Sequence, residues 1–368
     1  MDTALDLFLE LARLPTPPGK ERAAVDMVRD VLASFGVESV EDDAGPKING
    51  DAGNLYARIP ATAPGTPLFF NAHVDTVPMT APIDPVIEGD FVVNRHPTIL
   101  GADNKASVAG IIDGVRRVVR EGIPHAGIEL VITVQEEIGL IGAKAFDTGQ
   151  LEATVGYVYD VDGDPGAMTM RASSQITLDL EFRGKSAHAG IAPEDGRNAI
   201  HAAAIALSRL SMGRVAPGAS RSVGVINGGT QRNVVPDRCS VQLEVRSLVD
   251  AEVVVLAQEI VDAANAAAAE TECSVEIAQT REYTAYAFTN DDLVVQIARA
   301  GLTAAGLVPR EVETGGGADA HLFNERGLQC LNLASGMEAI HTPDERIKVE
   351  HVEDLSRMTV ELIRAATA

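Results

Sequence analysis

The sequence predicts an α/β fold in which a mixed, mostly parallel sheet is interrupted by a smaller inserted domain. In the first and last parts of the chain, short apolar runs typical of buried strands alternate with segments of helical periodicity. Between these parts, from about residue 170, the strands instead have one polar face. The length of 368 residues also suits two domains better than one.

The first part of the chain begins with two predicted helices. Residues 2–14 have apolar side chains at helical spacing, and the proline-rich stretch at 15–19 ends this helix. A second helix covers 25–35 and stops at Gly36. Apolar runs then predict strands at 55–59, 68–70, 128–134 and 155–159, with a helix at 104–120.

The middle of the chain predicts a ferredoxin-like unit. Apolar and polar side chains alternate in 176–183 and again in 241–246, which indicates strands with one exposed face. Together with helices at 198–211 and 251–269 and strands at 222–226 and 273–278, the order is β-α-β-β-α-β. The α/β pattern then returns in helices at 291–305, 318–326 and 352–366 and a strand at 329–333. We expect the larger domain to comprise 1–171 and 283–368, and the inserted domain to comprise 172–282.

Composition limits the possible functions. The formal charge of −23 argues against binding to nucleic acid or to an anionic membrane surface, because phosphate contacts need basic patches. Three scattered cysteines without a CxxC pair fit a reducing cytoplasm and exclude a thiolate zinc cluster. We see neither a signal peptide nor a run of about 18 apolar residues, so we expect a cytoplasmic protein.

Acidic residues and histidines gather where predicted strands end or loops begin. Two acids, Glu136 and Glu137, directly follow the apolar run at 128–134, and glycine follows them closely. Taken alone, such a pair is more often solvated. The other stretches of this kind contain His73 and Asp75, Asp103 before a helix, Asp160 at a strand end, and His341 in a loop.

These side chains suit a metal site. Strand ends of an open α/β sheet meet at the crevice where ligands bind. Two imidazoles and three carboxylates without a thiolate suit a pair of zinc ions, with cobalt or manganese as alternatives. Asp75 can orient the ring of His73. Because adjacent residues of an extended chain point in opposite directions, we expect Glu137 to face a metal and Glu136 to remain free as a general base.

These motifs resemble those of the co-catalytic zinc exopeptidases, a family that includes peptidase T, carboxypeptidase G, aminoacylase and succinyl-diaminopimelate desuccinylase. The resemblance lies in the stretches at 73–76, 101–105 and 136–139 and covers nearly the whole chain. Residues 16–21, the Asp-Gly at 162–163 and the glycines before Asp319 are similar to the peptidase T group.

The resemblance implies a role for each residue. His73 and Asp160 would bind one zinc ion, Glu137 and His341 the other, and Asp103 would bridge the two. Asp75 would support His73, and Glu136 would take the proton of the attacking water. The Asp-Gly pattern leaves Asp162 as an alternative to Asp160, which we prefer because it ends the apolar strand.

The inserted domain resembles the lid and dimerisation domain of the same family. His188 matches the histidine that stabilises the oxyanion in the partner subunit's active site. Arg246 matches the arginine that holds a substrate carboxylate. Asn233, in Asn-Val-Val-Pro, resembles a substrate-binding residue of the desuccinylase and carboxypeptidase branches.

The resemblance therefore implies a homodimeric enzyme with two Zn²⁺ per subunit that removes the N-terminal residue from short peptides, as a tripeptide aminopeptidase does. An N-acyl-amino-acid amidohydrolase or a carboxypeptidase of the same fold is the alternative. A non-catalytic, metal-stabilised dimer is a more distant one, because a closed structural site would not need Glu136, Asp75 or His188.

Overall fold

The computed structural model describes residues 3–367. These residues form two compact units. The first unit contains 3–170, 288–313 and 318–367, and the second contains 171–287 and 314–317. Each unit has its own hydrophobic core.

The first unit is built on a mixed sheet with a parallel centre, which confirms the predicted fold class. The strand order is β1-β2-β6-β3-β7-β16-β8, and β15 also pairs with β8. The neighbours β6, β3, β7 and β16 run parallel, and β1, β2 and β8 are antiparallel to their neighbours. The strands are β1 (Ser39–Glu41), β2 (Leu55–Ile59), β3 (Leu68–His73), β6 (Ile128–Thr133), β7 (Val155–Val161), β8 (Ala167–Ala172), β15 (Arg310–Thr314) and β16 (Gln329–Ala334).

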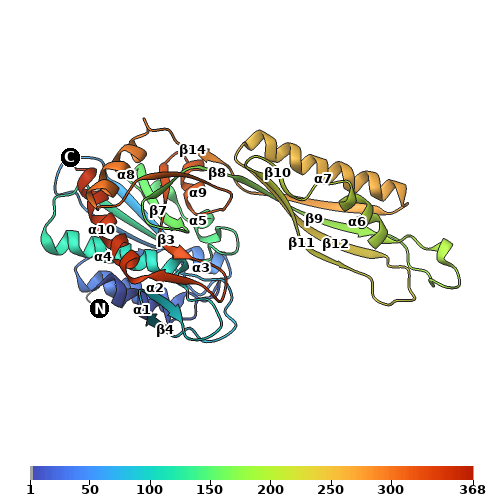
Figure 1. Ribbon diagram of the computed structural model, residues 1–368, viewed down its shortest axis with the longest axis horizontal. Coiled ribbons are helices and arrows are strands. Elements are labelled where there is room, and N and C mark those ends of the chain that lie inside the picture. The colour runs from blue at the N-terminus through green and yellow to red at the C-terminus, as the bar shows by residue number, and fades with distance from the viewer. Residues whose placement is uncertain (1–2, 368) are drawn as a thin grey trace. The chain divides into compact units, whose positions relative to one another are not determined.

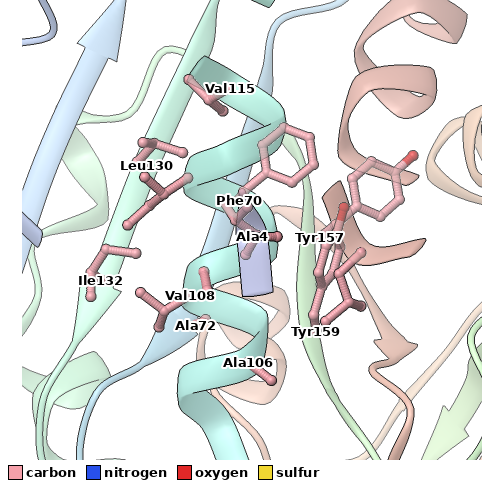
Figure 2. Close-up of a cluster of buried hydrophobic side chains, with 14 of the residues drawn as sticks. Ala4, Phe70, Ala72, Ala106, Val108, Val115, Leu130, Ile132, Tyr157 and Tyr159 are labelled. Carbon is pink, nitrogen blue, oxygen red and sulfur yellow. The ribbon is translucent and has the colours of Figure 1, made fainter. Parts of the chain in front are cut away.

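Helices α4, α10 and α1 pack together in the first unit (Figure 1). Figure 2 shows the apolar layer on β3, β6 and β7, where Phe70, Leu130 and Tyr157 lie close to Val108 and Val115 of α4. The helices are α1 (Ala4–Ala12), α2 (Arg22–Ser34), α3 (Ala44–Lys47), α4 (Ala102–Glu121), α5 (Ile141–Ala145), α8 (Leu293–Ala304), α9 (Ala320–Glu325) and α10 (Val349–Ala365). Short 3-10 turns lie at Thr148–Gln150 in this unit and at Pro193–Asp195 in the second.

A small second sheet in the first unit was not predicted. Its order is β17-β18-β5-β4, formed by Met337–Glu338, Arg346–Lys348, Phe91–Asn94 and Pro85–Glu88. Strands of two to four residues are too short to produce a readable alternation. The hairpin between β17 and β18 matters for function because its loop, residues 339–345, contains His341.

The second unit is a five-stranded antiparallel sheet with the order β10-β11-β12-β9-β13. Helices α6 (Ala199–Ser208) and α7 (Asp250–Glu270) pack on its apolar face. The strands are β9 (Ser174–Arg183), β10 (Gly213–Ala216), β11 (Ala219–Gly228), β12 (Arg238–Ser247) and β13 (Ser274–Tyr283), and β14 (Tyr286–Ala287) pairs with the end of β8. The predicted β-α-β-β-α-β order is present, with β10 as an added edge strand.

Two further observations concern the described residues as a whole. Cys239, Cys273 and Cys330 are all free thiols. Between residues 3 and 367, no helix combines the length and the apolar character that a membrane span requires.

Candidate metal centre

The end of β3 places His73 inside the first unit. Every residue of β3 is buried, and the side chain of His73 is only 2% exposed. Its Nδ1 lies 3.1 Å from the backbone oxygen of Asp75 and 3.4 Å from Oδ1 of the same residue. An imidazole that donates a proton from Nδ1 keeps its Nε2 lone pair free for a metal ion.

Asp75 also organises the loop that carries the two glutamates. Its Oδ1 accepts a hydrogen bond from the backbone N–H of Glu136 at 2.9 Å, and its Oδ2 accepts one from Glu137 at 3.1 Å. The residue is fully buried. Asp75 therefore contacts both His73 and the Glu136–Glu137 pair, whereas the sequence suggested only the contact with His73.

The expectation that Glu136 and Glu137 lie on extended chain was wrong. Strand β6 ends at Thr133, and Gln135 adopts a left-handed backbone conformation with a φ of 52°. The chain then turns so tightly that a Cβ on Gly142 would lie 2.1 Å from the carbonyl oxygen of Val134. The turn, rather than strand alternation, directs the two glutamates.

The two glutamates approach different histidines. Glu136 Oε2 lies 3.8 Å from His73 Nε2, and Glu137 Oε2 lies 3.1 Å from His341 Nε2. The two glutamates thus point in different directions, as expected, but the turn and not strand alternation is the cause.

Asp103 lies between the two histidines. Its Oδ1 is 3.3 Å from His73 Nε2, and its Oδ2 is 3.0 Å from His341 Nε2. Asp103 stands in the first turn of α4 after Gly101, which has a φ of 76° that favours glycine. The peptide bond that follows Asp103 is cis.

The structure also distinguishes the two candidates for the third acid. Asp160 Oδ1 lies 3.7 Å from His73 Nε2, and its side chain is 9% exposed. Asp162 is exposed in the turn after β7. Asp160 thus joins the cluster, as its position at the strand end suggested.

These side chains fit a metal cofactor. Ligand atoms of His73, Asp103 and Glu137 lie within 4.8 Å of one another, as do those of His73, Glu136 and Asp160. Asp103 Oδ1 and Glu137 Oε1 are buried without a hydrogen-bond partner. Buried carboxylate oxygens without partners are costly, and a cation satisfies them. The donors are nitrogen and oxygen atoms, which suits divalent metals such as zinc.

Electrostatics reflect this concentration of acids. Burial raises the pKa of Glu136 well above its ordinary value, although the nearby imidazole of His73 opposes the rise. Burial alone would lower the pKa of His73, but the surrounding carboxylates, led by Asp103, raise it. Hydrogen bonds to Asp103 and Glu137 raise the pKa of His341 to about 10. A bound cation would oppose this protonation, because it favours ionised carboxylates and neutral imidazoles.

Sequence reasoning missed several buried charged residues around the cluster. Glu21 accepts hydrogen bonds from the backbone N–H groups of Gly19 and Gln135, at 2.7 and 3.2 Å. Asp319 Oδ2 accepts one from the hydroxyl of Thr133 at 2.5 Å. Buried residues Lys105 and Glu345 also belong to this group. Their only signal in the sequence was their closeness to the motifs, since burial of a single charge leaves no periodic pattern.

The remaining predicted site residues belong to the second unit. His188 and Asn233 are exposed and lie on two paired segments, with the N–H of Ala189 donating to the carbonyl of Asn233 at 2.9 Å. Arg246 is 26% exposed and already binds a carboxylate, since its Nε and Nη2 donate to Glu244 at 3.1 and 3.0 Å. Its Nη1 donates to the carbonyl of Gly315 at 2.8 Å.

Comparison with known proteins identifies the family. Residues 172–272 match the model of a peptidase dimerisation domain, and residues 54–185 match that of peptidase family M28. The uncharacterized Bacillus subtilis protein YqjE is 35% identical over 98% of this chain and 98% of its own length. The crystal structure of aminopeptidase PepT from Bacillus cereus is 34% identical with a TM-score of 0.90, and covers 99% of this chain and 98% of its own.

The chain belongs to the zinc exopeptidase family related to peptidase T. A tripeptidase structure from Staphylococcus aureus, 30% identical with a TM-score of 0.94, also covers 99% of this chain and 98% of its own. The zinc exopeptidase resemblance inferred from the motifs is thus confirmed. The fold match extends over both units, and so includes the inserted domain.

Proposed function

We propose that this member of the zinc exopeptidase family is a homodimeric, two-zinc tripeptide aminopeptidase of the cytoplasm. The observation that carries the proposal is Asp103, whose two carboxylate oxygens each approach a different histidine. A bridging carboxylate between two cations is a common feature of hydrolases. The similarity to an aminopeptidase and to a tripeptidase supports the choice of substrate.

The proposed ligands are His73 and Asp160 for one ion, Glu137 and His341 for the other, and Asp103 for both. When bound, the ions would supply Lewis-acid chemistry at the scissile carbonyl. Asp75 fixes the tautomer of His73 and the direction of the two glutamates through the hydrogen bonds described above.

Glu136 is the proposed general base. It would accept a proton from the attacking water and later deliver it to the leaving amine. Burial raises the pKa of Glu136 above its ordinary value, which is the direction that a base working near neutral pH requires. His188 is proposed to stabilise the oxyanion, and Asn233 and Arg246 to bind the substrate.

For Arg246 the proposal requires an exchange of partners. Its guanidinium is bound by Glu244 through two nitrogens, so a substrate carboxylate would have to displace or share Glu244. A bidentate contact with the free C-terminus would favour short peptides.

A substrate panel tests the proposal. The zinc-loaded enzyme is incubated with dipeptides, tripeptides, tetrapeptides, N-terminally acetylated tripeptides, and acetylated or succinylated amino acids, and the products are identified by mass spectrometry. We expect release of the N-terminal residue from tripeptides and no cleavage of the acetylated forms. Cleavage of acyl-amino acids alone would instead identify an amidohydrolase, and release of the C-terminal residue a carboxypeptidase.

A further inference from the structure

Glu345 is a buried carboxylate that holds the loop in front of Asp103. Its Oε2 accepts hydrogen bonds from the backbone N–H groups of Leu100 at 2.8 Å and Gly101 at 3.0 Å. Its Oε1 accepts one from the N–H of Asp103 at 3.0 Å. With the side chain buried, these three bonds satisfy a charge that water does not reach.

Glu345 also belongs to the hairpin loop that carries His341. Strands β17 and β18 pair directly on either side of this loop, with Met337 opposite Ile347. Within the loop, the N–H of Glu345 donates to the carbonyl of Thr342 at 3.1 Å. The loop therefore brings the imidazole of His341 to Asp103 and also attaches itself to the backbone of Asp103.

The same arrangement occurs at the other ligand loop. There Asp75, also buried, accepts hydrogen bonds from the consecutive N–H groups of Glu136 and Glu137. In both places a buried carboxylate binds the backbone on which a candidate ligand stands. Such outer contacts orient metal ligands and influence metal affinity.

We propose that Glu345 is a positioning residue of the metal centre, fixing Asp103 and His341 relative to each other through the backbone of residues 100–103. The proposal rests on the proposed function in one respect, namely that Asp103 and His341 bind metal. Glu345 itself touches neither metal nor substrate in this proposal.

The test is E345Q, with zinc affinity measured by competition with a chromophoric chelator and zinc content measured by mass spectrometry. The amide replaces one carboxylate oxygen with an NH₂ group. Because both oxygens of Glu345 accept hydrogen bonds from backbone N–H groups, at least one of these bonds is lost. We expect zinc to bind at least one site about 10- to 100-fold more weakly. We also expect kcat to recover substantially in excess zinc. The matched control is D344N, because Asp344 is the exposed neighbour in the same loop, and its affinity should equal that of the wild type.

Two results would overturn the proposal. One is an unchanged zinc affinity in E345Q. The other is a double variant, E345Q with H341A, whose loss of zinc affinity equals the product of the two single losses. Residues that act through one site should instead show coupled effects. If E345Q does not fold, E345D provides the same comparison, since its carboxylate is one methylene too short to reach all three N–H groups.

The zinc-affinity measurement can fail or succeed independently of the peptidase assay, so the role of Glu345 and the peptidase assignment are tested separately. A wild-type enzyme that binds two zinc ions but leaves every peptide intact would contradict the peptidase assignment, while the affinity comparison would still decide the role of Glu345. A wild-type protein that binds no zinc would overturn both proposals.

Discussion

The candidate site residues of the two units are held in different ways. In the first unit, His73 and Asp75 are 2% and 0% exposed, and hydrogen bonds to the backbone fix their neighbours. In the second unit, His188 and Asn233 are exposed, and Arg246 is bound to Glu244. Burial therefore preorganises most of the metal cluster, with His341, 46% exposed, as the exception. In the second unit, His188 and Asn233 are open to new partners, whereas Arg246 would have to exchange Glu244 for one. Changes to the proposed metal ligands should lower zinc binding or stability, whereas changes to Glu136 or to the site residues of the second unit should lower activity without lowering the zinc content.

The largest expected effect comes from Glu136, which tests whether every buried acid of the cluster binds metal. In E136Q we expect kcat to fall by about 10²- to 10⁴-fold because the proposed base is removed. Zinc content, measured by mass spectrometry, should remain near that of the wild type. The matched variant is E137Q, which should lose zinc. Loss of zinc from E136Q with a retained rate would make Glu136 a ligand rather than the base.

An intermediate effect is expected at His188 in the second unit. H188A should lower kcat by about 10²- to 10³-fold, the usual effect of removing an oxyanion contact. Zinc content and the melting temperature should not change, because the side chain is exposed. The control is H201A, which removes another exposed histidine of the same unit. An equal loss of activity in both variants would contradict the specific role of His188.

The smallest expected effect concerns stability and pH at Glu21. Burial raises its pKa to about 7 from an ordinary value of 4.5, and its Oε2 is buried without a partner. A carboxyl with a raised pKa binds protons more tightly in the folded state, so the folded state loses stability as pH rises from about 4.5 to about 7. E21Q should remove this dependence.

The measurement is chemical unfolding of the metal-free protein at pH 5 and pH 7.5. Between pH 5 and pH 7.5, the free energy of unfolding should fall by on the order of 1 kcal/mol more in the wild type than in E21Q. E38Q, which changes an exposed glutamate in the same unit, should behave like the wild type. Identical pH profiles for the wild type and E21Q would show that Glu21 does not ionise in this range.

Periodicity predicted the long elements well. The ranges predicted for α4 and β7 differ from the observed Ala102–Glu121 and Val155–Val161 by only one or two residues at their ends. These elements are long and bury one face or both, so their apolar side chains form a pattern that can be recognised in the sequence. The short strands β4, β5, β17 and β18 were missed because a few residues contain too little pattern. The hairpin that carries His341 was therefore predicted only as a loop.

The candidate metal ligands could be chosen from the sequence, but the buried carboxylates that hold the surrounding loops in place could not. Acids and histidines at strand ends are recognisable because parallel strands end at a common edge. Glu345 and Glu21 act by accepting hydrogen bonds from backbone N–H groups that are distant in the chain, and a linear sequence contains no sign of such contacts.

The α/β class, the inserted ferredoxin-like unit and the side chains able to bind metal were predictable from the sequence alone, because they depend on local periodicity and residue chemistry. The three-dimensional structure was needed to show that Asp103 meets both histidines, that a left-handed turn at Gln135 directs Glu136 and Glu137, and that buried carboxylates hold the ligand loops. These features arise from contacts between segments that are far apart in the chain, such as the hydrogen bonds from Leu100, Gly101 and Asp103 to Glu345, which span 242 to 245 residues.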